Sequence, residues 1–288
     1  MLKLLPCVDS DAHAEARRSE LQISHHRAAA LGRSAVAAAN DGYYLNASGQ
    51  TVELHELLEE ARTSVRSLGP EDPLPGFVRP RHAQTSVQVC NETTLGASRR
   101  WVNEGRRPLA LNFANGQEPG GGLFHGALAQ EEALCRSSAL YLTLAEDPMY
   151  EAHQDRPESS DWAILSPQVP VFRDDKGNPL DPPWQLCFLT CAAPFVPNVG
   201  QPTSGDLLQK RIHRVLAIAQ AFGYDDLVLG AWGCGAFEND PHRTAADFRQ
   251  ALETDFRGAF ANIVFAIADW SPERRFLAPF RDVFSHPQ

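Results

Sequence analysis

The chain has 288 residues, of which 43% are hydrophobic, and it carries a net charge of −10 at pH 7. This hydrophobic content suffices for a continuous core and predicts a globular protein. The negative charge, with Lys and Arg spread along the chain, argues against a basic groove and therefore against direct DNA or RNA binding. A ligand that carries phosphates must then be held mostly by backbone N–H groups.

The sequence has no apolar run of the roughly eighteen residues that a membrane-spanning helix needs, and its N-terminus lacks the pattern of a signal peptide. We therefore expect a soluble, cytoplasmic protein without membrane contacts. Its six cysteines lie at irregular spacings, which predicts reduced, mostly buried thiols and no zinc site.

The first eighty residues differ in composition from the rest of the chain. Residues Asp11–Ala39 and Val52–Val65 have helical patterns, and the prolines Pro70, Pro73, Pro75 and Pro80 predict a connector that is neither helix nor central strand. We predict an N-terminal helical extension over residues 1–80, packed on a catalytic domain over residues 81–288.

From Thr85 onward, short apolar runs alternate with helical stretches, which predicts an α/β sandwich around a mostly parallel or mixed sheet. The predicted strands are Val87–Val89, Leu109–Phe113, Leu186–Cys191, Leu227–Gly230 and Ile263–Ile267, and the predicted helices are Glu131–Leu144, Leu207–Phe222 and Thr244–Glu253. Asp240 is a candidate N-cap for the last of these helices, with Pro241 at its first position. The segment Asp155–Pro183 holds six prolines and is predicted to be a long surface excursion.

A glycine triplet, Gly120–Gly122, follows the predicted strand Leu109–Phe113. Successive glycines allow positive φ values and bring backbone N–H groups close to a ligand, which suits a diphosphate or the edge of a sugar. The spacing matches neither a dinucleotide fingerprint nor a Walker loop. On its own, the triplet is equally consistent with a flexible turn.

Seven residues after the triplet comes Gln130-Glu131-Glu132, at the start of a predicted helix. Adjacent helical residues project about 100° apart, so two neighbouring carboxylates cannot flank one bond as a glycosidase pair does. One glutamate can instead protonate a leaving oxygen while the other binds sugar hydroxyls. The alternative is that acidic residues merely favour the first turn of a helix.

A second glycine-rich turn, Gly233-Cys234-Gly235-Ala236-Phe237, precedes the helix that Asp240 and Pro241 begin. Such a turn is a place where backbone N–H groups and a helix N-terminus meet an anion. Phe237 is then either a ligand contact or an ordinary core residue. Cys234 has no identifiable nucleophile partner, and His125, between the two motifs, is a further candidate for a ligand contact.

These motifs together resemble the poly(ADP-ribose) glycohydrolase family in its microbial form. The family signature is a Gly-Gly-Gly turn, a gap of six to eight residues and Gln-Glu-Glu. The segments Leu111–Asn115, Thr190–Pro194 and Gly230–Phe237 also match it. The resemblance extends from roughly residue 18 to the C-terminus. It implies a macrodomain-like three-layer α/β/α sandwich with a mixed sheet and an N-terminal helical extension.

The resemblance also implies roles for individual residues. Glu132 is expected to be the general acid, Glu131 to bind ribose hydroxyls, Gln130 to support the pair and Asn115 to contact the distal ribose. The turns Gly120–Gly122 and Gly233-Cys234-Gly235 are expected on the diphosphate, with Ala236 and Phe237 at the distal ribose and Glu92 at the adenine.

The activity implied is hydrolysis of ribose–ribose bonds in poly(ADP-ribose), including polymer attached to modified proteins, with release of ADP-ribose. No metal or cofactor is implied, a monomer is expected, and the activity would reverse ADP-ribosylation in the DNA damage response. Glu132 must hold a proton near neutral pH, which burial and the Glu131 charge favour and the helix dipole opposes.

Three alternatives stay open at this stage. The first is a non-catalytic macrodomain that binds ADP-ribose. The second is a hydrolase of mono-ADP-ribosyl groups, and the third is a structural protein whose glycine turns are only loops. The intact Gln130-Glu131-Glu132 triplet argues against a pure binding module, because binding does not need it.

Overall fold

The computed structural model describes residues 1–76 and 82–285 as one α/β sandwich, so Pro80 of the predicted connector lies outside the described residues. Its central sheet has eight strands in the order β1-β5-β10-β9-β6-β8-β7-β4. These strands are β1 (Leu2–Leu4), β4 (Arg66–Leu68), β5 (Thr85–Cys90), β6 (Leu109–Ala114), β7 (Ala163–Arg173), β8 (Pro179–Ala192), β9 (Asp226–Leu229) and β10 (Asn262–Ala266). A separate hairpin pairs β2 (Tyr43–Leu45) with β3 (Thr51–Glu53).

The sheet is mixed, as predicted. In the spatial order of the sheet, the neighbouring strands β1, β5, β10, β9, β6 and β8 all pair in parallel. Strand β7 pairs antiparallel with both β8 and β4. Because the carboxyl ends of the parallel strands share one edge, the loops that follow β6, β9 and β10 meet there.

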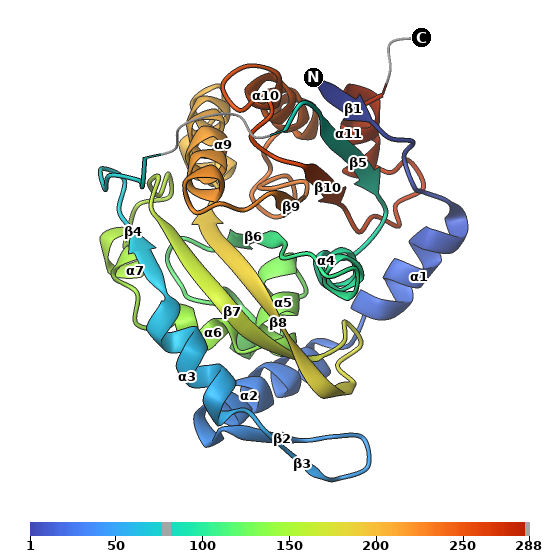
Figure 1. The fold of residues 1–288 in the computed structure, drawn as a ribbon, viewed down its shortest axis with the longest axis vertical. Helices are drawn as coiled ribbons and strands as arrows, with labels where there is room; N and C mark the ends of the chain where they lie inside the picture. The colour runs from blue at the N-terminus through green and yellow to red at the C-terminus, as the bar shows by residue number, and fades with distance from the viewer. Residues whose placement is uncertain (77–81, 286–288) are drawn as a thin grey trace.

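Helices cover both faces of the sheet (Figure 1). The helices are α1 (Asp11–Leu21), α2 (His25–Asp41), α3 (His55–Ser64), α4 (Thr94–Asn103), α5 (Gln130–Ser137), α6 (Leu140–Leu144), α7 (Pro148–Ala152), α8 (Val196–Val199), α9 (Thr203–Ala221), α10 (Pro241–Glu253) and α11 (Leu277–Val283), with a 3-10 turn at Leu123–His125. Strand residues alternate between two hydrophobic cores: Leu227 and Leu229 pack with α9 to α11, and Val228 packs with α2 to α7. The predicted three-layer α/β/α class is confirmed.

Several predicted elements are divided differently in the structure. The helix predicted over Asp11–Ala39 is two helices, because Ser24 accepts a hydrogen bond from the Arg27 N–H and begins α2 as a new helix. The predicted helix Val52–Val65 starts with strand β3. The predicted helix Glu131–Leu144 breaks at Ser138, which has an extended backbone and whose hydroxyl accepts from the N–H of Leu140, the first residue of α6.

The predicted surface excursion Asp155–Pro183 is wrong. It contains β7, an almost entirely buried strand next to the edge of the sheet, and the start of β8. Pro167 and Pro170 hid the strand pattern, since proline is rare in strand interiors. The structure accommodates Pro167 at a register shift between Ser166 and Val169.

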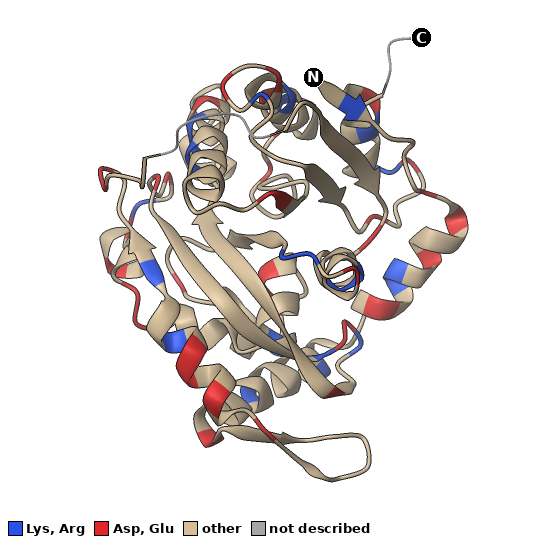
Figure 2. Ribbon diagram, in the orientation of Figure 1, with Lys and Arg blue, Asp and Glu red and all other residues tan. Residues whose placement is uncertain are grey.

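The first eighty residues contribute both edge strands, β1 and β4, to the main sheet, and α2 packs on α5. The division at residue 80 stays a prediction. Within the described part of the chain, no helix is long and apolar enough to cross a membrane. Figure 2 shows Lys and Arg scattered over the helices, loops and edge strands, while the central strands β5, β6 and β10 carry no charged residue.

Candidate active site

A cavity of about 500 Å³ lies at the carboxyl edge of the sheet. Its walls come from the ends of β6 and β10, the starts of α4 and α5, the loop after β9, and Leu21 of α1. Crevices outside the carboxyl ends of parallel strands are the usual ligand sites of α/β folds. Four carboxylates and no Lys or Arg stand among the described residues that border the cavity. Backbone N–H groups must therefore supply most of the contacts to an anionic ligand.

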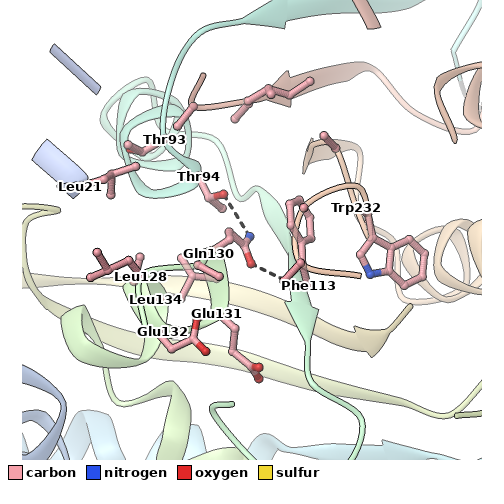
Figure 3. Close-up of a pocket in the computed structure, with 18 of the residues that line it drawn as sticks. Leu21, Thr93, Thr94, Phe113, Leu128, Gln130, Glu131, Glu132, Leu134 and Trp232 are labelled. Atoms are coloured by element: carbon pink, nitrogen blue, oxygen red, sulfur yellow. Dashed lines mark hydrogen bonds between the residues drawn. The ribbon is translucent and has the colours of Figure 1, made fainter. Parts of the chain in front are cut away.

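Gln130 fixes the start of α5 to the sheet (Figure 3). Its Oε1 accepts from the Phe113 N–H at 2.9 Å, and its Nε2 donates to the Leu111 carbonyl at 2.8 Å and the Thr94 hydroxyl at 3.1 Å. These three bonds join α5 to β6 and α4. The position of the next two residues, Glu131 and Glu132, is therefore set by the backbone of the sheet.

Both carboxylate oxygens of Glu131 have partners. Oε2 accepts from the Asn115 N–H at 2.8 Å, and Oε1 accepts from Nδ2 of Asn112 at 3.3 Å. Burial raises the pKa of Glu131 to about 8, and the charge of Glu132 acts in the same direction. The hydrogen bonds to the carboxylate oppose this shift without cancelling it.

Glu132 is held at one oxygen only. Its Oε1 accepts from the Gly122 N–H at 2.8 Å, whereas no described residue donates to its buried Oε2. The residue is 7% exposed and borders the cavity. A carboxyl with one fixed oxygen and one unengaged oxygen is suited to exchanging a proton with a ligand.

The Gly120–Gly122 turn faces the glutamates. Gly120 and Gly121 have φ values of +70° and +57°, and a Cβ on Gly121 would lie 2.6 Å from Oε1 of Glu132 and 3.1 Å from Oε2 of Glu131. Both carboxylates thus converge on one glycine. None of the three glycines is among the described residues that border the cavity, so their contact with a diphosphate stays a prediction.

The second turn does border the cavity, through Gly233, Gly235, Ala236 and Phe237. The Phe237 ring meets the Phe195 ring edge to face, with centroids 5.4 Å apart. Asp240 is the N-cap of α10, as predicted, and accepts from the His242 and Arg243 N–H groups. Those two donors are therefore already used, and an anion at this turn would have to meet the amides of the turn itself.

Cys234 is not among the described residues that border the cavity. Its side chain is 4% exposed, packs in the core with α9 and α10, and donates to the Trp232 carbonyl at a sulfur–oxygen distance of 3.5 Å. Burial raises the pKa of its thiol to about 12. Only the backbone of Cys234 is placed to take part in the predicted ligand contact.

The remaining predicted site residues lie as follows. Asn115 borders the cavity, but its Oδ1 accepts from the Gln117 and Glu118 N–H groups. Glu92 also borders it and is paired with Arg100 at 2.9 Å. Their predicted contacts with ribose and adenine stay predictions. His125 is exposed and does not border the cavity in the described structure.

Sequence reasoning missed Asp175, Trp270 and Leu21, which also border the cavity. Asp175 lies in the loop between β7 and β8 and accepts from the Thr93 hydroxyl at 2.7 Å, and burial raises its pKa to about 6. Asp175 reaches the cavity only through tertiary packing. The sequence shows no sign of this, because the β7–β8 hairpin lies in the segment predicted to be a surface excursion. Trp270 follows β10 and is 40% exposed, and its place three residues after the predicted strand Ile263–Ile267 is the signal that the sequence offered.

The buried guanidinium of Arg136, one helical turn after Glu132, has no hydrogen-bond acceptor among the described residues. The negative charges of Asp175 and Glu132 act electrostatically on this guanidinium and favour its charged form. No group of three or more His, Cys, Asp or Glu residues in the described ranges is placed to hold a metal ion.

A sandwich of this kind, with a glutamate pair at a helix start between two glycine-rich turns, has the parts of a macrodomain-like glycoside hydrolase. The family model "Microbial-type PARG, catalytic domain" matches residues 32–174. The X-ray structure of poly(ADP-ribose) glycohydrolase from Thermomonospora curvata is 38% identical, with a TM-score of 0.82, covering 90% of this chain and 99% of that one.

Two ligand-bound structures are also similar. The Thermomonospora curvata enzyme bound to the inhibitor ADP-HPD is 38% identical, with a TM-score of 0.82, and covers 89% of this chain and 99% of that one. The Deinococcus radiodurans enzyme in complex with ADP-ribose is 38% identical, with a TM-score of 0.72, and covers 81% of this chain and 98% of that one. No curated protein matches. The chain belongs to the microbial-type poly(ADP-ribose) glycohydrolase family and is a glycoside hydrolase.

Proposed function

We propose that this chain binds ADP-ribose units and hydrolyses the ribose–ribose O-glycosidic bonds of poly(ADP-ribose), releasing ADP-ribose. The observation that carries the proposal is the unequal engagement of the two glutamates. Glu132 borders the cavity and has one oxygen without a donor among the described residues, whereas both oxygens of Glu131 accept hydrogen bonds. The free oxygen supports Glu132 as general acid, and the fixed carboxyl supports Glu131 as the group that binds ribose hydroxyls.

Cleavage of the bond passes through an oxocarbenium-like state, and protonation of the leaving 2′-oxygen avoids the expulsion of an alkoxide. Glu132 gives its proton to that oxygen as the bond breaks. Water then attacks the sugar, and the Glu132 carboxylate accepts the proton of that water. Bound substrate excludes water and adds a negative diphosphate, and both effects favour protonated carboxyl groups in the cavity.

Incubation of the protein with purified poly(ADP-ribose), followed by chromatographic separation of monomer from oligomers, tests this function. ADP-ribose as the main product supports it, and short oligomers would reveal internal cleavage. Unchanged polymer together with tight ADP-ribose binding would instead identify a binding module. Release of ADP-ribose only from a singly modified protein would identify a mono-ADP-ribosyl hydrolase.

We also propose that the enzyme is monomeric and cytoplasmic. We propose that it acts on polymer attached to modified proteins and does not bind DNA or RNA directly. Light scattering after size-exclusion chromatography tests the monomer. A comparison of free and protein-attached polymer in the same assay tests the substrate.

A further inference from the structure

His153 is a fully buried histidine outside the cavity. It follows α7 directly, and each of its ring nitrogens contacts one polar group. Nδ1 lies 3.1 Å from the Gly116 carbonyl oxygen, and Nε2 lies 2.6 Å from the Ser160 hydroxyl. His153 therefore joins the segment after α7 to the loop after β6.

The partners of His153 fix its tautomer. The Gly116 carbonyl can only accept, so Nδ1 must carry the hydrogen and Nε2 must accept from the Ser160 hydroxyl. The Trp162 N–H in turn donates to the Ser160 oxygen at 3.3 Å. Burial lowers the pKa of His153 to about 4, and the charge of Arg211 acts in the same direction. The imidazole is therefore neutral near pH 7, with its N–H directed at Gly116.

The Gly116 carbonyl that His153 holds belongs to the segment whose backbone N–H groups donate to the two glutamates. We call residues Asn115–Gly122 the carboxylate loop, because the Asn115 N–H donates to Glu131 and the Gly122 N–H donates to Glu132. Gly116 is closely enclosed: a Cβ there would overlap the Ser159 hydroxyl and lie 3.1 Å from Cβ of Ala192. The start of the carboxylate loop is thus held by His153 and closely enclosed by Ser159 and Ala192.

We propose that His153 is a positioning residue for catalysis, because its Nδ1–H holds the Gly116 carbonyl and so keeps the neighbouring Asn115 amide on Glu131. An apolar side chain could fill the same buried space without removing two ring nitrogens from water, so the hydrogen bond to the loop is the distinctive contribution of a histidine. This inference rests on the proposed function, since it concerns the rate of that reaction.

The test compares His153→Leu with His153→Asn in steady-state hydrolysis of poly(ADP-ribose). Leucine removes the donor, whereas the Asn amide places an N–H near the position of Nδ1. We expect kcat to fall about tenfold or more in His153→Leu with KM changed by less than about threefold, because misplaced catalytic groups slow the chemical step more than they weaken binding. His153→Asn should recover most of that loss.

Val215→Ala, in the core on the far face of the sheet, is the control for lost stability, and it should lower the melting temperature without lowering kcat. Equal kcat in wild type and His153→Leu, or equal losses in the Leu and Asn variants, would overturn the inference. If His153→Leu does not fold, Ser160→Ala and Ser160→Thr replace it: a loss of kcat in the Ala variant alone supports the inference, and equal kcat values overturn it. Absence of hydrolysis by the wild type would contradict the proposed function instead.

Discussion

The backbone N–H of Gly122 donates a 2.8 Å hydrogen bond to Oε1 of Glu132, ten residues later in the chain. The glycine turn therefore orients the proposed acid directly. Gly121, beside it, leaves room for both glutamate carboxylates because it has no Cβ.

Gly121→Ala is expected to abolish most of the activity while the protein stays folded. The new methyl group would lie 2.6 Å from Oε1 of Glu132 and must displace one or both carboxylates. We expect kcat to fall about 100-fold or more, measured with poly(ADP-ribose) as substrate. Gly49→Ala is the matched control, because Gly49 also has a positive φ, +78°, but open space around its Cβ position. Equal activity losses in the two variants would mean that backbone strain, and not the glutamates, is responsible.

The raised pKa of Glu131 predicts a pH dependence of stability. Because its pKa rises from an ordinary value of 4.5 to about 8, the folded state binds this proton more tightly than the unfolded state does. This contribution is complete below pH 4.5 and is lost as the pH rises through 8. Each pKa unit corresponds to about 1.4 kcal/mol, so the loss amounts to several kcal/mol.

Glu131→Gln removes this titration. Its melting temperature relative to wild type should rise by roughly 5 °C or more between pH 5.5 and 8.5, as measured by calorimetry. Glu56→Gln, at an exposed position on α3, should show no such trend. A constant difference between Glu131→Gln and wild type over this range would show that Glu131 is ionised throughout.

Trp270 is expected to contribute to ligand affinity and not to the chemical step. Trp270 is 40% exposed and borders the cavity together with Glu92 and Phe276, and an aromatic ring there is suited to stacking on a base. Such stacking contributes about 1–3 kcal/mol, so Trp270→Ala should weaken ADP-ribose binding roughly tenfold by calorimetry and leave kcat nearly unchanged. Tyr43→Ala, an equally exposed aromatic on the β2–β3 hairpin, is the control. Unchanged affinity in Trp270→Ala would place the base elsewhere.

Much of the sheet could be predicted because its strands are buried on both faces and appear as continuous apolar runs. Leu109–Phe113 and Ile263–Ile267 differ from the observed strands β6 and β10 by at most one residue at either end. Strand β7 could not be found in this way, because Pro167 and Pro170 interrupt it and its place in the sheet depends on pairing with β8.

The same distinction applies to the site. Glu131 and Glu132 follow a local motif and could be located from it, whereas the unequal hydrogen bonding that separates their roles depends on contacts with Asn115 and Gly122. Asp175 comes to the cavity from a hairpin tip whose position is set by tertiary packing. Burial, which raises the pKa of Glu131, is likewise a property of the folded chain.

Glu132→Gln is the variant that shows whether Glu132 donates the proton. The Gln side chain keeps the size of Glu and an oxygen for the Gly122 N–H, but it cannot act as an acid. Single-turnover cleavage of poly(ADP-ribose), with ADP-ribose affinity measured on the same preparation, should show a rate loss of about 100- to 10,000-fold at an affinity within about threefold of wild type. Cleavage by Glu132→Gln at the wild-type rate would show that another group donates the proton.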